Sequence, residues 1–385
     1  MRNRSHTVLF FGVLVAFTAV CAVRTLRAQA AKAPARTPAK ATPARAAAPL
    51  PRTPDGHPDF QGLYDVATVT PVERPAEAGG RLVLTDEEAA AAEAYDKQRE
   101  AKDAAPISGD RGAPSVGGER VATKTWLEAV EQFAGGGTGG YNRFWIEQGR
   151  QFITVDGQKR SSILIDPPDG KIPPMKPEAR QRLARLRAAA ADPSAGEGAT
   201  SGPPGAFDGP ESRPLAERCL LGFNSTAGPP ALPNYFYNNF KQIVQTRDTV
   251  LILNEMVHDA RVVRIGGKHL PPTIRRWMGD SIGWWEGDTL VVDTTNFTTK
   301  TQFNGSSDQL HVVERIRRVD ANTLLYRFTI EDPATWDRAW TGEYPWKATQ
   351  EHLYEYACHE GNYAMTNMLR GARFKEAEDA SKKQE

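Results

Sequence analysis

Short apolar runs separated by turn residues fill the second half of the chain. The stretch 277–297 (WMGDSIGWWEGDTLVVDTTNF) shows the pattern most clearly, because two runs rich in apolar and β-branched residues, 281–286 and 289–297, flank Gly287-Asp288. Glycine relieves the positive backbone angle that a two-residue hairpin turn requires. The stretch therefore predicts a strand, a tight turn and a second strand.

Runs of the same kind continue on both sides of this hairpin. They predict further strands at residues 240–245, 249–255, 260–265, 310–319, 323–331 and 353–358. Consecutive hairpins without intervening helices form a meander, and a long meander tends to close into a barrel because closure removes its exposed edges. We therefore predict a mainly β protein, an antiparallel meander in a lipocalin-like barrel with a few peripheral helices. An open two-sheet sandwich is the alternative.

The first half of the chain predicts fewer elements. Short strands are expected at residues 63–70, 151–155 and 161–165. Thr85 and Glu88 form a capping box, in which each side chain bonds the backbone of the other residue, so a helix begins there and runs to about residue 102. Pro177 suits the first turn of a second helix, which continues over residues 178–191.

Register decides which side chains of the hairpin 310–331 face the interior. If Asp320 pairs with Thr323, one face is an apolar wall that includes a histidine and two arginines, and the other face places Glu314 on a half-solvated surface. A slip of one residue would exchange the two faces. The expected wall consists of His311, Val313, Arg315, Arg317 and Val319 opposite Leu324, Tyr326, Phe328 and Ile330.

The N-terminal residues have the composition of an export signal and a tether. Residues 1–30 contain two early arginines, an apolar run and the cleavage sequence Ala28-Gln29-Ala30, which predict a secretory signal peptide. Residues 31–52 are rich in Ala, Pro, Lys and Arg, a composition that favours a disordered basic tether. After them we expect a wrapping region at 53–210, a barrel-like region at 211–375 and a disordered tail at 376–385.

Charge and cysteine content narrow the class of protein. The first 52 residues hold nine of the 48 Lys and Arg and none of the 47 Asp and Glu, so the remainder is acidic, which argues against a nucleic-acid partner. Two cysteines remain after the signal peptide, and in an exported chain they predict the disulfide Cys219–Cys358. A reactive Cys358 next to His359 is the alternative. We expect a periplasmic or secreted protein with no stable membrane span after signal removal.

The candidate catalytic residues are imidazoles and carboxylates at predicted strand ends. The chain has no His-Glu-x-x-His, no Cys-x-x-Cys and no phosphate-binding glycine loop, so its motifs leave the cofactor open. Histidine and carboxylate side chains are the types that general acid–base catalysis needs. The candidates are His258, Asp259, His311 and Glu314.

Each of these candidates also has an alternative interpretation. His258, His311 and His359 are nitrogen donors that could bind a metal, although no metal site is predicted. Local pairing is the other alternative, for example of Asp259 with Arg261.

Tryptophan gathers between residues 277 and 346. This distribution favours an aromatic-lined pocket for an apolar or planar small molecule, with packing in the barrel core as the alternative. The candidate ligand-binding residues are polar or aromatic side chains in or beside the predicted strands: Arg261, Trp277, Asp280, Trp284, Arg315, Tyr326 and His359.

Three stretches resemble a family of secreted bacterial proteins that is abundant in soil bacteria. They are RSSILIDPPDGKIPP (160–174), the stretch 277–297 and YEYACHEGNYAMTNMLRGAR (354–373). The resemblance covers the chain from about residue 54 onward. It implies export and one shared fold across both halves, but it names no activity, substrate or catalytic residue.

Three functions are open at this point. The first is a periplasmic or secreted barrel that binds a small apolar or aromatic molecule. The second is a hydrolase, lyase or isomerase with a His/carboxylate site, and the third is an envelope-associated structural module attached by the basic tether. An apolar cavity would favour binding, His and carboxylate groups within hydrogen-bond reach would favour catalysis, and a filled barrel without a pocket would favour the structural module.

Overall fold

The computed structural model describes residues 50–103, 147, 149–189, 207–222, 228–234, 237–301 and 303–382. The predicted signal peptide and most of the predicted tether lie outside these residues. At the end of the predicted tether, Arg52 donates hydrogen bonds of 2.9 and 2.7 Å to the two carboxylate oxygens of Asp288. Arg52 is thereby joined to the turn of the 277–297 hairpin.

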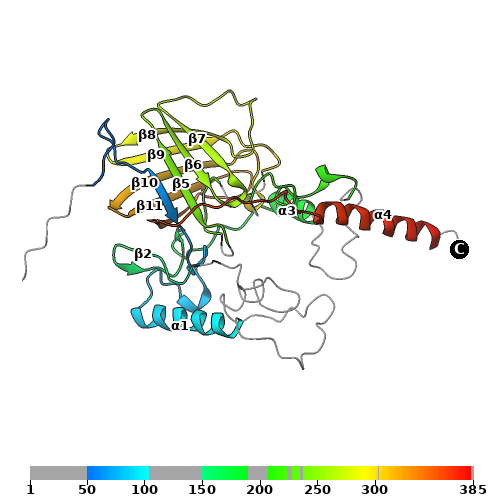
Figure 1. The fold of residues 1–385 in the computed structure, drawn as a ribbon, viewed down its shortest axis with the longest axis horizontal. Helices are drawn as coiled ribbons and strands as arrows, with labels where there is room; N and C mark the ends of the chain where they lie inside the picture. Colours follow the sequence, from blue (N-terminus) through cyan, green and yellow to red (C-terminus); the bar gives the residue numbers. More distant parts are fainter. Residues whose placement is uncertain are drawn as a thin grey trace, which may run out of the picture. The chain divides into compact units, whose positions relative to one another are not determined.

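Nine strands close into a barrel (Figure 1). The last of them, β12, pairs again with the first, so the prediction of a mainly β protein built on a barrel is confirmed. In spatial order the strands are β1 (Gly62–Asp65), β5 (Phe240–Gln245), β6 (Thr249–Asn254), β7 (Ala260–Ile265), β8 (Asp280–Glu286), β9 (Thr289–Thr295), β10 (His311–Asp320), β11 (Thr323–Glu331) and β12 (Trp340–Ala348).

Neighbouring strands are antiparallel except β7 and β8, which pair in parallel with Val263 opposite Ser281. A closed ring with an odd number of strands cannot reverse direction at every step, so at least one parallel pair is required. Residues 266–279 make the return, because a tight hairpin can join only antiparallel neighbours. The purely antiparallel meander was therefore wrong at this step.

Strand β12 was not predicted, and the strand predicted at 353–358 is not formed. Residues 340–348 contain Gly342 and Pro345, which both disfavour the interior of a strand. Along the same edge of β12, the backbone N–H of Glu343 donates to the region of β4 (Leu164–Asp166), and pairing with β1 begins only at Lys347. Pro345 lies between these two pairings, so its missing N–H costs no ladder hydrogen bond.

The first half of the chain contributes one strand of the barrel wall and several shorter strands. Because β1 is part of the barrel wall, the barrel does not begin at residue 211 as predicted. Strand β4 pairs with the start of β12, and β2 (Thr154–Val155) and β3 (Gln158–Lys159) form a separate two-stranded ribbon. One fold therefore draws on both halves of the chain.

Helices α1 (Asp86–Asp103), α3 (Pro177–Ala189) and α4 (Ala364–Lys382) lie outside the barrel wall (Figure 1). The predicted capping box of α1 is formed, with the Thr85 N–H 2.9 Å from Glu88 and the Glu88 N–H 3.1 Å from the Thr85 hydroxyl. The disordered tail predicted from residue 376 was wrong as far as Lys382, where α4 ends. Ion pairs of Lys375 with Asp379 and of Lys382 with Glu378 support this last part of the helix.

A bulge changes the predicted faces of the hairpin formed by β10 and β11. Asp320 pairs with Thr323 as expected, but Val319 is an extra residue and Arg318 pairs with Leu324. The side chains of β10 before the bulge therefore exchange faces relative to the prediction. The predicted wall was wrong for β10 and correct for β11. The inward residues are Val312, Glu314, Ile316 and Arg318 together with Leu324, Tyr326, Phe328 and Ile330.

Large side chains fill the interior of the barrel. Trp340, Trp346, Tyr326 and Tyr344 are fully buried, and the rings of Tyr326 and Trp346 stack with centroids 4.8 Å apart. Residues 228–234 are also buried throughout and pack against these tyrosines: the Ala231 N–H donates to the Tyr326 hydroxyl at 2.9 Å, and the Tyr344 hydroxyl donates to the Ala231 carbonyl at 2.6 Å.

The predicted disulfide Cys219–Cys358 is formed, with the two Cα atoms 5.8 Å apart. It joins residues 207–222 to the segment that follows β12, and a disulfide is compatible with secretion. Within the described part of the chain, every helix is too short or too polar to cross a membrane.

Candidate functional site

Strands β7 to β11 and the β7–β8 connection place a row of charged and imidazole side chains on the outside of the barrel wall. Each member contacts the next, so the side chains form one continuous chain of charge-assisted contacts. We call it the outer-face row. Its members are Arg264, Asp280, His269, Asp293, His311 and Glu331.

Asp293 is the centre of the outer-face row. One of its carboxylate oxygens lies 2.8 Å from Nε2 of His269, and the other lies 2.8 Å from Nε2 of His311. Nδ1 of His269 lies 3.1 Å from Asp280, and Nδ1 of His311 lies 3.4 Å from Glu331. Two imidazoles therefore share one carboxylate, and each has a second carboxylate at its other nitrogen.

The strand period explains why these side chains meet. In β9 the side chains of Leu290, Val292 and Thr294 point inward, so Asp293 points outward. Val313 is the residue of β10 paired with Asp293, and His311 lies two residues along the same outer face, within reach of a diagonal contact.

The connection between β7 and β8 supplies the other histidine. The Leu270 N–H donates to Asp280 at 2.9 Å, and the Asn296 side-chain amide donates to the Leu270 carbonyl at 2.9 Å. These two bonds fix the connection against the outer face. They hold His269 between Asp280 and Asp293.

Asp280 and Asp293 both have lowered pKa values. Asp280 is 1% exposed, and burial raises its pKa, but hydrogen bonds from the Leu270 N–H, Arg264 and His269 outweigh burial and lower it overall. Burial also raises the pKa of Asp293, and hydrogen bonds with His311 and His269 lower it overall. Both side chains are thus held as anions beside the imidazoles.

His311 is the more exposed of the two imidazoles in the row. Its pKa is raised, mainly by the hydrogen bond to Asp293, against the opposing effect of burial. Its side chain is 32% exposed. A partly exposed imidazole that is oriented by a carboxylate can accept a proton from a bound molecule and return it, which is the chemistry of a general acid or base.

The four predicted catalytic residues do not form one site. His311 and Glu314 lie on opposite faces of β10, because side chains three residues apart on a strand point in opposite directions. His258 is exposed in the short helix η6 (Met256–His258), and Asp259, which follows it, is half-buried at the start of β7. The prediction of a joint site was wrong for His258, Asp259 and Glu314.

Three of the predicted residues meet inside the barrel instead. Both terminal nitrogens of Arg261 donate to the Glu314 carboxylate, at 2.5 and 2.7 Å, and the Tyr326 hydroxyl donates to Glu314 at 2.7 Å. Burial lowers the pKa of Arg261, but the Glu314 carboxylate outweighs burial and raises it overall. Burial raises the pKa of Tyr326.

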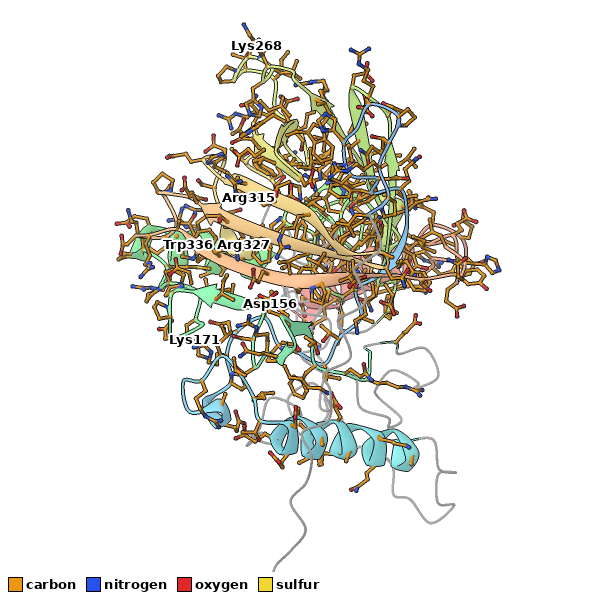
Figure 2. All side chains as sticks on the ribbon, turned by 90° about the vertical axis from the view of Figure 1, so that its left-hand side faces the viewer. Asp156, Lys171, Lys268, Arg315, Arg327 and Trp336 are labelled. Atoms are coloured by element: carbon orange, nitrogen blue, oxygen red, sulfur yellow. A yellow bond between two sulfur atoms is a disulfide. The ribbon has the colours of Figure 1, made fainter. Side chains whose placement is uncertain are left out.

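The other predicted ligand-binding residues are scattered. Asp280 is in the outer-face row. Trp284 and Arg315 lie on the outside of the wall, where both donate to Glu286, at 3.1 and 2.6 Å (Arg315 and its neighbour Arg327 are labelled in Figure 2). Trp277 is half-buried before β8, and His359 is exposed next to the disulfide. These side chains do not line a common pocket.

Sequence reasoning missed His269 and Asp293. Asp293 could have been found from the sequence, because it is a lone charged residue in the apolar run of β9, Thr289–Thr295. His269 could not have been found in this way, because only the path of the β7–β8 connection brings it to Asp293.

Sequence reasoning also overlooked a motif in the central stretch. Residues 279–283 spell GDSIG, which matches the Gly-x-Ser-x-Gly pattern of a nucleophile elbow. The elbow requires a strand, a sharp turn and a helix, whereas Ser281 lies in strand β8. Its hydroxyl faces the interior, 2.8 Å from the Thr294 hydroxyl. The Ser281 hydroxyl is therefore buried and not available as a nucleophile.

The structure also contains a groove of about 220 Å³ on the barrel wall. It is bounded by residues 65–68 and 149–153 and by Pro345 and Lys347, at the edge of β12 where pairing with β1 begins. The groove contains no histidine. Within the described ranges, no three His, Cys, Asp or Glu side chains are placed to hold a metal ion.

A comparison with models of protein families, with curated proteins and with solved structures found no match. The resemblance to a family of secreted bacterial proteins therefore stays a prediction.

Proposed function

We propose that the protein is an exported β-barrel enzyme that transfers protons between His311 and a bound substrate, and is thus a hydrolase, lyase or isomerase. The observation that carries the proposal is the Asp293 carboxylate, 2.8 Å from an imidazole nitrogen on each side. Export is supported by the signal-peptide sequence at residues 1–30 and by the disulfide Cys219–Cys358.

Each side chain of the row has a separate task in this reaction. Asp293 orients the His311 ring and stabilises it when it carries two protons. Nδ1 of His311 lies 3.4 Å from Glu331, too far for a strong hydrogen bond, so this nitrogen is the one that exchanges a proton with substrate. His269 is a positioning residue, because it holds the other oxygen of Asp293.

The two other functions receive less support. A carrier of an apolar molecule needs an apolar cavity, and the part of the interior around Tyr326 is occupied by aromatic side chains that pack on one another. A structural module has no need of a partly exposed imidazole between two carboxylates.

Variants of His311 and Asp293 test the proposal. The purified mature protein is assayed on p-nitrophenyl esters, lactones and ketose–aldose pairs, and the best turnover is followed in His311→Gln and Asp293→Asn. Both variants should lose on the order of 10²-fold or more in kcat/KM, because general acid–base catalysis contributes about 10²–10⁴-fold.

The matched control is His359→Gln, because His359 is exposed and outside the row. It should keep full activity. Two outcomes would contradict the proposal. One is turnover that survives in His311→Gln, and the other is a folded wild-type protein that turns over no substrate of the panel.

Stability should depend on pH through His311. Its pKa is raised in the folded protein, so the folded state holds the proton more tightly than the unfolded chain does. This contribution is complete below the ordinary histidine pKa of about 6.5 and disappears as pH rises through the folded-state value. His311→Gln should therefore lower the free energy of unfolding more at pH 6 than at pH 9. Urea unfolding of the wild type and the variant at both pH values measures this, and an equal loss at pH 6 and pH 9 would contradict the prediction.

A further inference from the structure

Lys241 is a buried amine without a partner. It lies at the start of β5 with its side chain inside the barrel, and it is 0% exposed. Among the described residues, its Nζ atom has no hydrogen-bond partner. A buried polar group that is left unsatisfied costs free energy, so a partner of another kind is expected at this nitrogen.

Two more atoms with unused hydrogen-bonding capacity lie beside Lys241. Asn254 is directly opposite Lys241 on β6, and both its backbone N–H and its side-chain amide donate to the Asp259 carbonyl, at 2.8 and 3.4 Å. The Asn254 side-chain oxygen and one carboxylate oxygen of Asp259 are buried without a partner. An amine, an amide oxygen and a carboxyl oxygen therefore lie near one another, none of them satisfied by the described protein.

Burial shifts both charged groups toward neutrality. It lowers the pKa of Lys241 to about 8 and raises that of Asp259 to about 7, although the two groups attract each other. Glu255, whose pKa is also raised by burial, is the other charged group that acts on Lys241. A desolvated amine is a stronger nucleophile at neutral pH than a surface lysine, and a carboxyl group that titrates near neutrality can carry protons for it.

The backbone before Asp259 is held in an uncommon conformation. Val257 and His258 have φ of 60° and 46°, in the left-handed region that a β-branched residue such as Val disfavours. His258 is exposed, while Asp259 is half-buried. The turn thus places the Asp259 carboxyl group directly after an exposed residue and close enough to Lys241 for the two to interact electrostatically.

We propose that Lys241 forms an imine with a small aldehyde or ketone inside the barrel, at a site separate from the outer-face row. The amine nitrogen attacks the carbonyl carbon, and Asp259 protonates the carbonyl oxygen, which gives a carbinolamine. Asp259 takes a proton from the nitrogen and returns it to the hydroxyl, which leaves as water when the C=N bond forms. Asn254 accepts a hydrogen bond from the carbinolamine hydroxyl.

Reductive trapping tests this site in the full mature protein. Dihydroxyacetone is the probe, sodium cyanoborohydride reduces the imine, and peptide mass mapping locates the label. Lys268, which is exposed at the top of Figure 2, is the internal reference. At pH 7.5, Lys241 should be labelled at least about tenfold faster than Lys268, because the lowered pKa of Lys241 leaves a large fraction of it as free amine. Equal or slower labelling of Lys241 would overturn the proposal.

Two variants separate the roles of the site. Lys241→Met keeps an unbranched side chain and should remove the fast label. Asp259→Asn should slow labelling at Lys241 at least tenfold and leave Lys268 unchanged, and an unchanged rate at Lys241 would contradict the role of Asp259. If Lys241→Met fails to fold, the rate at which Lys241 is labelled in Asp259→Asn still tests the proposed site. His311→Gln should leave the labelling of Lys241 unaffected. The imine site and the proposed enzymatic site are therefore tested independently.

Discussion

Glu314 occupies a position in the barrel interior that a carboxylate can take only with partners. It is 0% exposed and bonds both Arg261 and Tyr326. A buried ion pair offers little net stability over apolar residues, but removing one partner leaves an uncompensated buried charge. Glu314 therefore acts on the stability of the barrel, whereas His311, three residues away on the opposite face, is available for chemistry.

At this residue scale, Glu314→Gln should lower the free energy of unfolding by about 3–5 kcal/mol, because it strands the Arg261 charge. The double variant Glu314→Leu/Arg261→Met removes both charges and should recover most of that loss. Urea unfolding of the two variants beside the wild type measures the difference. A double variant as unstable as the single one would show that packing, and not charge, sets the cost.

At the scale of elements, two glycines of the central hairpin region have similar backbone angles and different surroundings. Gly279, just before β8, has φ of +70°, and a Cβ there would lie 2.6 Å from the Thr295 carbonyl oxygen. Gly287, in the turn between β8 and β9, has φ of +58° and nothing within 4 Å. The turn needs only the backbone angle, whereas the start of β8 needs both the angle and the space.

Alanine at each of these glycines separates the two requirements. Gly287→Ala should cost about 1–2 kcal/mol, the price of the left-handed conformation alone. Gly279→Ala should cost more, because the backbone of β9 must also move. Thermal and urea unfolding of both variants tests the order, and equal costs would argue against close packing of β8 on β9 at this point.

At the scale of the whole molecule, closure and cross-linking hold distant parts of the chain together. The ring of nine strands leaves the wall without a free edge, apart from the interval in β12 at Pro345. The disulfide Cys219–Cys358 closes a loop between residues 139 positions apart. In the chain-entropy model such a long loop stabilises the fold mainly by restricting the unfolded chain.

Replacing both cysteines, Cys219→Ser with Cys358→Ser, should lower the free energy of unfolding by about 4–5 kcal/mol. Reduction of the wild type with dithiothreitol should lower it by a similar amount and leave the double variant unchanged. Urea unfolding under both conditions provides the comparison. A double variant as stable as the oxidised wild type would contradict the structural role of the bond.

What the sequence by itself determined are the features that depend on neighbours along the chain. The alternation of side chains and the turn residues located strands β5 to β11, and the pairing of Thr85 with Glu88 located the start of α1. The disulfide also followed from the sequence, because only two cysteines remain outside the predicted signal peptide. Each of these inferences needs only local spacing or a count.

Only the tertiary structure decided which side chains meet. The extra residue Val319 turned Glu314 inward, and the parallel step from β7 to β8 carried His269 to Asp293. Strand β12 exists because its neighbours supply the hydrogen bonds that a segment with Gly342 and Pro345 cannot secure alone. Register, bulges and strand direction are set by pairing between segments far apart in the chain, and the local pattern of residues does not encode them.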